Sequence, residues 1–269
     1  MVEPALPMMN PSSTWAVLQK LINSSAPFRP QLEEIYTQLP ATVCRRRTHC
    51  CSLLPEMTLL EALQAIAYLV RLPEDLRKDL LERILLYFFL NPVEIRTCPF
   101  LQDRDCLIYR VRFFGCRAYG LWSKDYYEEW SRENRQSKDP LQQEWKKLGV
   151  SLPAEVSHFQ VPYCHRVKPE PPAASNDQVL FHLSERIENL SWELGPQHRE
   201  FREQTFSDLS FFLAGLQFGT LEAVRLKFFI VRDMIQKGDR SRLDGVLNQL
   251  TDPFPKEPKG TDSLLAQGR

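Results

Sequence analysis

The residues of this sequence that could do chemistry are its seven cysteines, and their spacing is uneven. All seven lie between positions 44 and 164, in the order Cys44, Cys50, Cys51, Cys98, Cys106, Cys116 and Cys164. Cysteines brought together from separate loops can complete a tetrahedral thiolate site for zinc or hold an iron–sulfur cluster. Soft thiolates select these metals over magnesium or calcium. The clustering therefore predicts a metal site holding zinc or iron.

Two other interpretations of the cysteines are disulfide bonds and buried core thiols. The N-terminal residues have no basic segment followed by an apolar stretch, so we expect a cytoplasmic protein, in which thiols stay reduced. An odd number of cysteines also fits poorly with a closed disulfide framework. Any single cysteine is as readily a small buried core residue as a ligand, but the local clusters favour metal binding.

Basic residues stand beside several of the cysteines. Arg45, Arg46 and Arg47 follow Cys44, and Arg112 and Arg117 flank Cys116. Positive charge at these positions favours thiolate over thiol, although the three consecutive arginines also read as a solvated loop. His49 and His165 each lie next to a cysteine, which leaves open whether an imidazole completes the coordination.

The second group of cysteines carries a family resemblance. The segments Cys98-Pro99-Phe100-Leu101, Cys106-Leu107-Ile108-Tyr109 and Cys116-Arg117, with Arg112 between them, resemble the second block of the YkgJ-type cysteine-cluster family, described as zinc- or iron-chelating proteins. The family's first block, C-x-x-C-x-x-C-C, maps onto Cys44, position 47, Cys50 and Cys51. This chain has Arg47 in place of one cysteine, and Phe113 in place of the usual proline after Arg112.

The resemblance covers about residues 44–120 and implies a set of ligands and neighbours. The implied metal ligands are Cys44, Cys50, Cys51, Cys98, Cys106 and Cys116, with Tyr109, Arg112 and Arg117 surrounding them. Cys164 lies outside both blocks and could supply the ligand lost at position 47. The resemblance leaves the number of metal ions open.

The cysteines and the resemblance suggest three classes of function, and we favour metal binding. Relatives that share the second block include flagellin lysine methylases, so an iron–sulfur-dependent protein lysine methyltransferase or redox protein is one alternative. The first 114 residues contain no glycine, which excludes a G-x-G-x-x-G or phosphate-binding loop there, and neither occurs later. The other alternative is an adaptor, in which zinc is a structural staple and the C-terminal helices bind a protein partner.

Charge and hydropathy limit the classes of binding partner that we expect. The 34 basic and 34 acidic side chains cancel, so no bulk charge favours nucleic acid. The longest apolar run, residues 84–90, is far shorter than the roughly 20 residues that a membrane helix needs. We therefore expect a metal ion and a possible protein partner or protein substrate, without membrane association.

The elements that must position the cysteines are mostly helical. Apolar periodicity and capping signals predict helices over residues 14–23, 30–39, 62–70, 126–148, 177–194, 206–216, 220–236 and 240–250, with a further helix starting at Pro73. Thr58 and Glu61 form a capping-box pattern, and a break is expected near Pro140. Residues 106–114 alternate weakly and are either extended or irregular. The fold class is therefore mostly α, with irregular cysteine-rich loops between helices.

The proline-rich segment 167–176 suggests a division of the chain. We expect a cysteine-bearing unit over residues 13–166, a helical C-terminal unit over 177–250 and a flexible tail over 251–269. The aromatic residues Tyr119, Trp122, Tyr126, Tyr127 and Trp130 recur at helical spacing. That spacing is typical of a packing face more than of a substrate groove.

Overall fold

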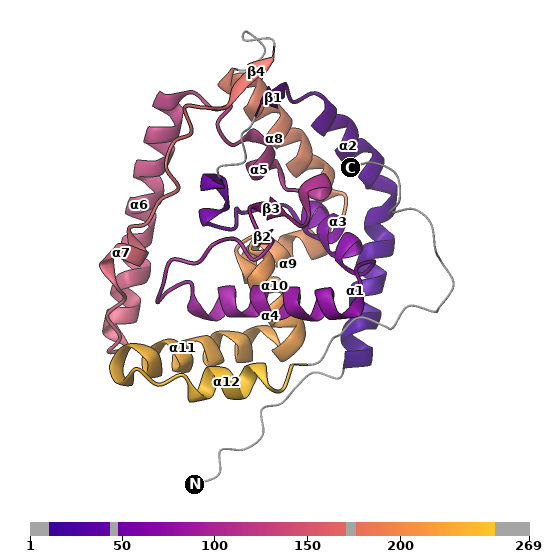
Figure 1. Ribbon diagram of the computed structural model, residues 1–269. Helices are drawn as coiled ribbons and strands as arrows, with labels where there is room; N and C mark the ends of the chain where they lie inside the picture. Colours follow the sequence, from indigo (N-terminus) through magenta and orange to yellow (C-terminus); the bar gives the residue numbers. More distant parts are fainter. Residues whose placement is uncertain (1–10, 44–47, 171–175, 251–269) are drawn as a thin grey trace.

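The computed structural model describes residues 11–43, 48–170 and 176–250, and it is mostly helical, as the sequence predicts (Figure 1). The α-helices are α1 (Pro11–Ser25), α2 (Arg29–Thr37), α3 (Leu59–Leu69), α4 (Glu74–Leu90), α5 (Phe114–Ala118), α6 (Lys124–Lys147), α7 (Ala154–Ser157), α8 (Asp177–Trp192), α9 (Pro196–Thr205), α10 (Leu209–Phe218), α11 (Thr220–Lys237) and α12 (Ser241–Leu247). The short 3-10 helices in the described ranges are η1 (Ala26–Phe28), η2 (His49–Ser52) and η3 (Tyr109–Val111).

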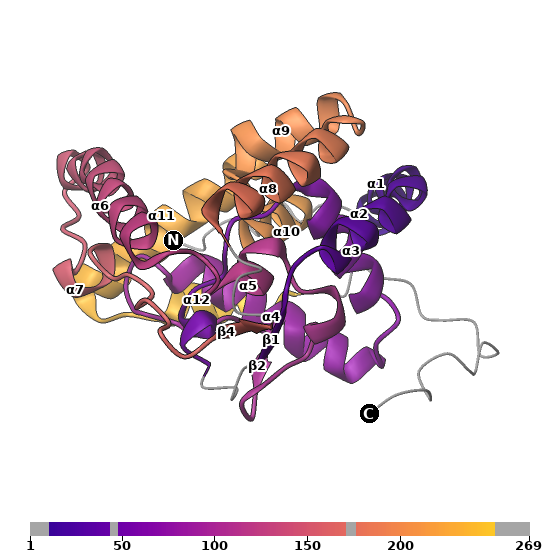
Figure 2. The ribbon, with the colours of Figure 1, turned by 90° about the horizontal axis from the view of Figure 1, so that it is seen from above.

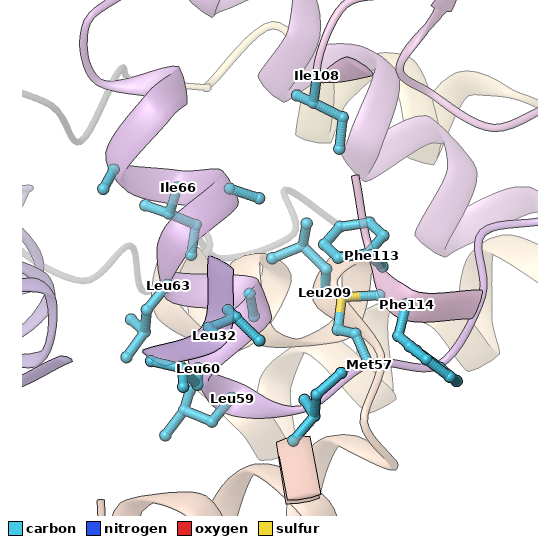
Figure 3. Packing of buried hydrophobic residues seen from close by; sticks show 14 of the residues in the cluster. Leu32, Met57, Leu59, Leu60, Leu63, Ile66, Ile108, Phe113, Phe114 and Leu209 are labelled. Carbon is cyan, nitrogen blue, oxygen red and sulfur yellow. The ribbon is translucent and has the colours of Figure 1, made fainter. Parts of the chain in front are cut away.

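Helix α3 is almost entirely buried, and its start is fixed by the capping box. The Thr58 hydroxyl accepts from the Glu61 backbone N–H at 3.3 Å, and the Glu61 carboxylate accepts from the Thr58 backbone N–H at 2.9 Å. The two bonds satisfy amide groups that a helix N-terminus otherwise leaves free. Most side chains of α3 are buried, including Leu60, Leu63 and Ile66 (Figure 3). This helix is therefore surrounded by other elements on nearly all sides.

The buried apolar side chains form two clusters. The first is built around α3 and combines α1, α2, α8 and α9 with the loops that carry the cysteines. The second lies where α4 packs on α10 and α11, with Phe88 stacked on Phe211 at 5.1 Å between ring centroids. Both clusters contain residues from before and after the proline-rich segment. The helices on the two sides of that segment are thus packed on one another, as both views show (Figures 1 and 2).

Helix α6 runs along one edge of the molecule, far from α1 and α2 (Figures 1 and 2). The expected break at Pro140 is wrong, because α6 continues through the proline to Lys147. Proline lacks the N–H that would bond the carbonyl four residues earlier. Both Gln136 and Pro140 are exposed, so water can satisfy that carbonyl and the missing bond is tolerated.

Two small antiparallel sheets complete the described part of the fold. Strand β1 (Ala41–Val43) pairs with β4 (Lys168–Glu170), which brings the chain after Cys164 back beside the chain before Cys44. Strands β2 (Leu101–Gln102) and β3 (Asp105–Cys106) form a hairpin. Its two turn residues, Asp103 and Arg104, both have positive φ, as a tight type I′ turn requires.

The segment after this hairpin is irregular, which is one of the two structures expected for residues 106–114. Cys106 ends β3, and residues 109–111 form the single turn η3. An extended strand over residues 106–114 is therefore wrong. None of the helices within the described ranges is long and apolar enough to span a membrane.

Candidate metal centre and adjoining cavity

Five thiols from four chain segments come together at the centre of the molecule. Cys50 and Cys51 lie on η2, Cys98 follows α4, Cys106 ends β3, and Cys116 lies on α5. The backbone N–H of Cys98 donates to the carbonyl of Cys51 at 2.7 Å, which ties the first two segments together. The sulfur atoms of Cys50 and Cys51 are 3.9 Å apart. The structure thus brings together cysteines from both blocks of the sequence pattern.

The five thiols act on one another electrostatically. A hydrogen bond from Cys51 lowers the pKa of the Cys50 thiol to about 7, against the effect of burial. The pKa of Cys51 is raised, first by this same bond and then by burial. Burial raises the pKa of Cys98 to about 12 and also raises that of Cys106. The pKa of Cys116 is well above its ordinary value, first because of burial and then because of the charges of Cys98, Cys106 and Cys50. Like charges at close range repel, so a cation among these sulfurs would stabilise their ionised forms.

Arg112 lies close enough to these thiols to act on them electrostatically. Its positive charge lowers the pKa of Cys50, Cys106 and Cys116, as a lesser contribution in each case. The Arg112 guanidinium carbon also stands 4.2 Å from the ring centroid of Tyr109. The Nε of Arg112 is buried and has no hydrogen-bond partner within the described part of the chain. A buried donor without a partner is costly, and an anionic sulfur is a suitable acceptor for it.

Five thiols are enough, and of the right chemical kind, to bind a soft metal such as zinc or iron. Their sulfur atoms are not, however, arranged around a common point as metal ligands would be. Within the described residues, no three His, Cys, Asp or Glu side chains are placed so that they could hold a metal ion. Ligation would therefore need a rearrangement of these side chains. Cys50, Cys51 and Cys98 stand on a 3-10 turn and a loop, where such a rearrangement is less restricted than on a long helix.

The other residues predicted for the site are Cys44, Cys164, His49, His165 and Arg117. Cys44 falls outside the described residues. Cys164 is partly buried and packs beside Gly120. A Cβ atom added to that glycine would lie 3.3 Å from the Cβ of Cys164. His49 and His165 are both exposed. Arg117 is engaged away from the sulfurs: its guanidinium stacks over the Tyr36 ring at 4.0 Å and donates to two backbone carbonyls.

A cavity of about 980 Å³ adjoins the thiols, and Cys50 and Cys116 form part of its wall. The five aromatic residues at helical spacing, Tyr119, Trp122, Tyr126, Tyr127 and Trp130, also line it, so they border a cavity as well as packing on one another. Glu185 and Glu188 of α8 are among the other residues of the wall. The volume is within the range of small-molecule sites and far exceeds that of a metal ion.

The sequence pattern gave no reason to single out Glu61 beyond its capping role. This carboxylate reaches across to α5, the helix that carries Cys116, and it borders the cavity. A capping box predicts only the local bond at the start of its own helix. The contact with α5 depends on tertiary packing and has no local signal.

Comparison with known proteins adds no assignment. No protein-family profile matches the sequence, and no curated protein or solved structure is significantly similar to it.

Proposed function

We propose that Cys50, Cys51, Cys98, Cys106 and Cys116 hold a metal centre, either zinc or an iron–sulfur cluster. The observation that supports this proposal best is the convergence of five thiols from four chain segments. The buried Arg112 Nε beside them, which lacks a partner among the described residues, supports a negatively charged centre. The resemblance to the YkgJ-type cysteine-cluster family points to the same metals.

The centre would tie irregular segments to the helical core. The loop before α3, the loop after α4, the hairpin and α5 have little regular structure of their own. Metal ligation by residues of each segment contributes free energy of folding that short loops cannot obtain from packing. Four of the five thiols suffice for one tetrahedral site. Cys44 is a candidate for a further ligand, because it precedes η2 closely in the sequence.

Metal analysis of the protein purified without oxygen tests the proposal. We expect at least about one equivalent of zinc or iron, and less than about half an equivalent of either would overturn it. A brown sample with broad visible absorption would identify an iron–sulfur centre, whereas a colourless sample containing zinc would identify a zinc site.

Matched variants tie the metal to these thiols. The Cys98→Ser/Cys116→Ser double variant should lose the metal. Cys164→Ser should retain it, because Cys164 packs beside Gly120 rather than on η2, the hairpin or α5. Equal metal content in the two variants would contradict the assignment.

We propose an enzyme as the second candidate function, because the cavity reaches the thiols. Cys50 and Cys116 share its wall with five aromatic side chains. A purely structural zinc site requires no such cavity, whereas a catalytic centre needs room for a substrate beside it. A protein lysine methyltransferase and an iron–sulfur redox protein are the classes that the family resemblance suggests.

A ligand screen separates this candidate from a structural or adaptor role. Stabilisation of the metal-loaded protein by S-adenosylmethionine, measured as a rise in Tm, would support a methyltransferase. No shift with any methyl donor would count against that class. Capture of a partner by the full chain with an intact centre, together with silence in the screen, would instead favour the adaptor.

A further inference from the structure

Glu61 is a buried carboxylate that joins three elements around the thiols. It lies on α3 with 3% of its surface exposed. Its Oε2 accepts from the backbone N–H and the hydroxyl of Thr58, at 2.9 and 3.1 Å. Its Oε1 accepts from the Tyr36 hydroxyl at 2.7 Å and from the Phe114 backbone N–H at 2.6 Å.

These four bonds use the full accepting capacity of the carboxylate. Two carboxylate oxygens offer about four lone-pair sites, and four donors occupy them here. Glu61 is therefore not available as a metal ligand or as a base, although it borders the cavity. Its contribution must come through the groups that it holds.

Phe114 is the first residue of α5, and Cys116 follows it two residues later. The N–H groups of a first helical turn have no partner within the helix, so an acceptor at this point fixes where the helix begins. Glu61 supplies that acceptor from α3, in addition to closing the capping box of α3 itself. One carboxylate thus anchors the N-termini of two helices.

The C-terminal end of α5 is held through Arg117, which packs on Tyr36. The Tyr36 ring lies under the guanidinium of Arg117, with 4.0 Å between the guanidinium carbon and the ring centroid. Arg117 in turn donates to the carbonyls of Arg110 and Arg112, at 2.7 and 2.8 Å. Glu61, Tyr36 and Arg117 therefore enclose the segment between Cys106 and Cys116 in a closed set of contacts.

We infer that Glu61 is a positioning residue, which holds α5 and thereby keeps Cys116 beside the other thiol-bearing segments. Its relevance to metal binding rests on the proposed function, whereas the position of Cys116 does not. Phe113 and Phe114 pack in the core with Met57 and Leu209, so apolar contacts fix the depth of the segment (Figure 3). The hydrogen bond that Glu61 accepts from Phe114 and those that Arg117 donates set its orientation.

The test measures the reactivity of individual cysteines in the reduced, metal-free full chain. The protein is treated with N-ethylmaleimide, and the modification rate of each cysteine is followed by peptide mass mapping. In Glu61→Ala we expect Cys116 to react at least about fivefold faster than in the wild type, because release of α5 further exposes a thiol that is only partly accessible in the fold. Cys164, which packs beside Gly120, serves as the internal reference and should keep its rate.

Thr58→Ala is the matched control. It removes the hydroxyl from the capping box but leaves the bonds of Glu61 to Tyr36 and Phe114. It therefore weakens the start of α3 without releasing α5, and the Cys116 rate should stay within about twofold of the wild type. If Glu61→Ala does not fold, Glu61→Gln carries the test. Its amide NH2 group cannot accept hydrogen bonds and faces one pair of donors, so the Cys116 rate should still rise above that of the wild type.

An unchanged Cys116 rate in folded Glu61 variants would overturn the inference. An equal rise at Cys116 in Thr58→Ala would overturn it too, because general destabilisation would then explain the effect. Cobalt(II) titration of the same proteins distinguishes this failure from failure of the proposed function. A wild type that binds no cobalt and is purified without oxygen with neither zinc nor iron refutes the metal centre, whereas the modification rates still decide the role of Glu61.

Discussion

The backbone N–H of Cys98 donates to the carbonyl of Cys51 over 2.7 Å, so two cysteine segments far apart in sequence are joined by their main chains. This bond is independent of the side chains. We predict that Cys98→Ala keeps it, costs about 1 kcal/mol of unfolding free energy and leaves the helix content unchanged. The same variant should bind zinc or iron at least about tenfold more weakly, because it removes a thiolate ligand. Circular dichroism and metal titration give the two readings, and full metal affinity would show that Cys98 is a core residue only.

The Lys227 side chain predicts a pH-dependent stability. Burial lowers its pKa to about 8, and its Nζ stands 4.3 Å from the centroid of the Phe88 ring. The unfolded chain holds this proton up to its ordinary pKa of about 10.4, so between about pH 8 and 10.4 the unfolded state binds the additional proton. This lysine therefore makes stability rise as pH rises through that window.

Lys227→Met isolates the effect. We expect the variant to be more stable than the wild type at pH 7, by at most about 3 kcal/mol, and the advantage to shrink toward pH 10. Urea unfolding of both proteins at several pH values provides the measurement. A difference that does not depend on pH would show that Lys227 keeps its ordinary pKa in the folded protein.

Asp233 fixes the end of α11 against α12. Its carboxylate, 5% exposed, lies 3.0 Å from Lys237 and 3.0 Å from Arg242, the latter on α12. We predict that Asp233→Asn costs about 1–2 kcal/mol, since the buried partner of several cations is lost. Glu222→Gln is the control, because Glu222 pairs with an exposed Arg225 at 3.5 Å and should change stability by less than about 0.5 kcal/mol. Equal effects of the two changes, measured by urea unfolding, would contradict this account.

The shared clusters predict cooperative unfolding of the ranges 13–166 and 177–250. Leu63 and Ile66 lie in the same cluster as Leu183 and Ile187 of α8. We expect thermal unfolding followed by circular dichroism and by tryptophan fluorescence to give one coincident transition. Residues 177–250 expressed alone should show no cooperative transition. A fragment that unfolds cooperatively at the Tm of the full chain would instead establish two independent units.

Local signals account for much of the fold. Apolar periodicity placed the helices now seen as α3, α4, α8 and α11, and the capping box at Thr58 is confirmed. Gly238 ends α11 in the left-handed conformation, as expected for a C-terminal cap. The polar helix α9 was not predicted, because only His198, Phe201 and Thr205 of its residues are buried and its apolar stripe is short.

The candidate site was predictable only in part. Cysteine spacing indicated which residues belong together, and five of them do lie within electrostatic reach of one another. The bonds of Glu61 to Tyr36 and Phe114 join positions remote in sequence, and no local pattern encodes such contacts. The cavity could not be predicted either, because helical spacing of Trp122, Tyr126 and Trp130 is equally consistent with a packing face.

The indole rings of Trp122 and Trp130 border the same cavity as Cys50 and Cys116. The molecule therefore carries optical reporters beside its thiols. An iron–sulfur cluster absorbs light across the range in which indole emits and would quench these two tryptophans, whereas zinc has no such absorption and would leave them bright. The emission of the intact protein can thus report which kind of centre the thiols hold, inside a sealed anaerobic cuvette and without removal of the metal.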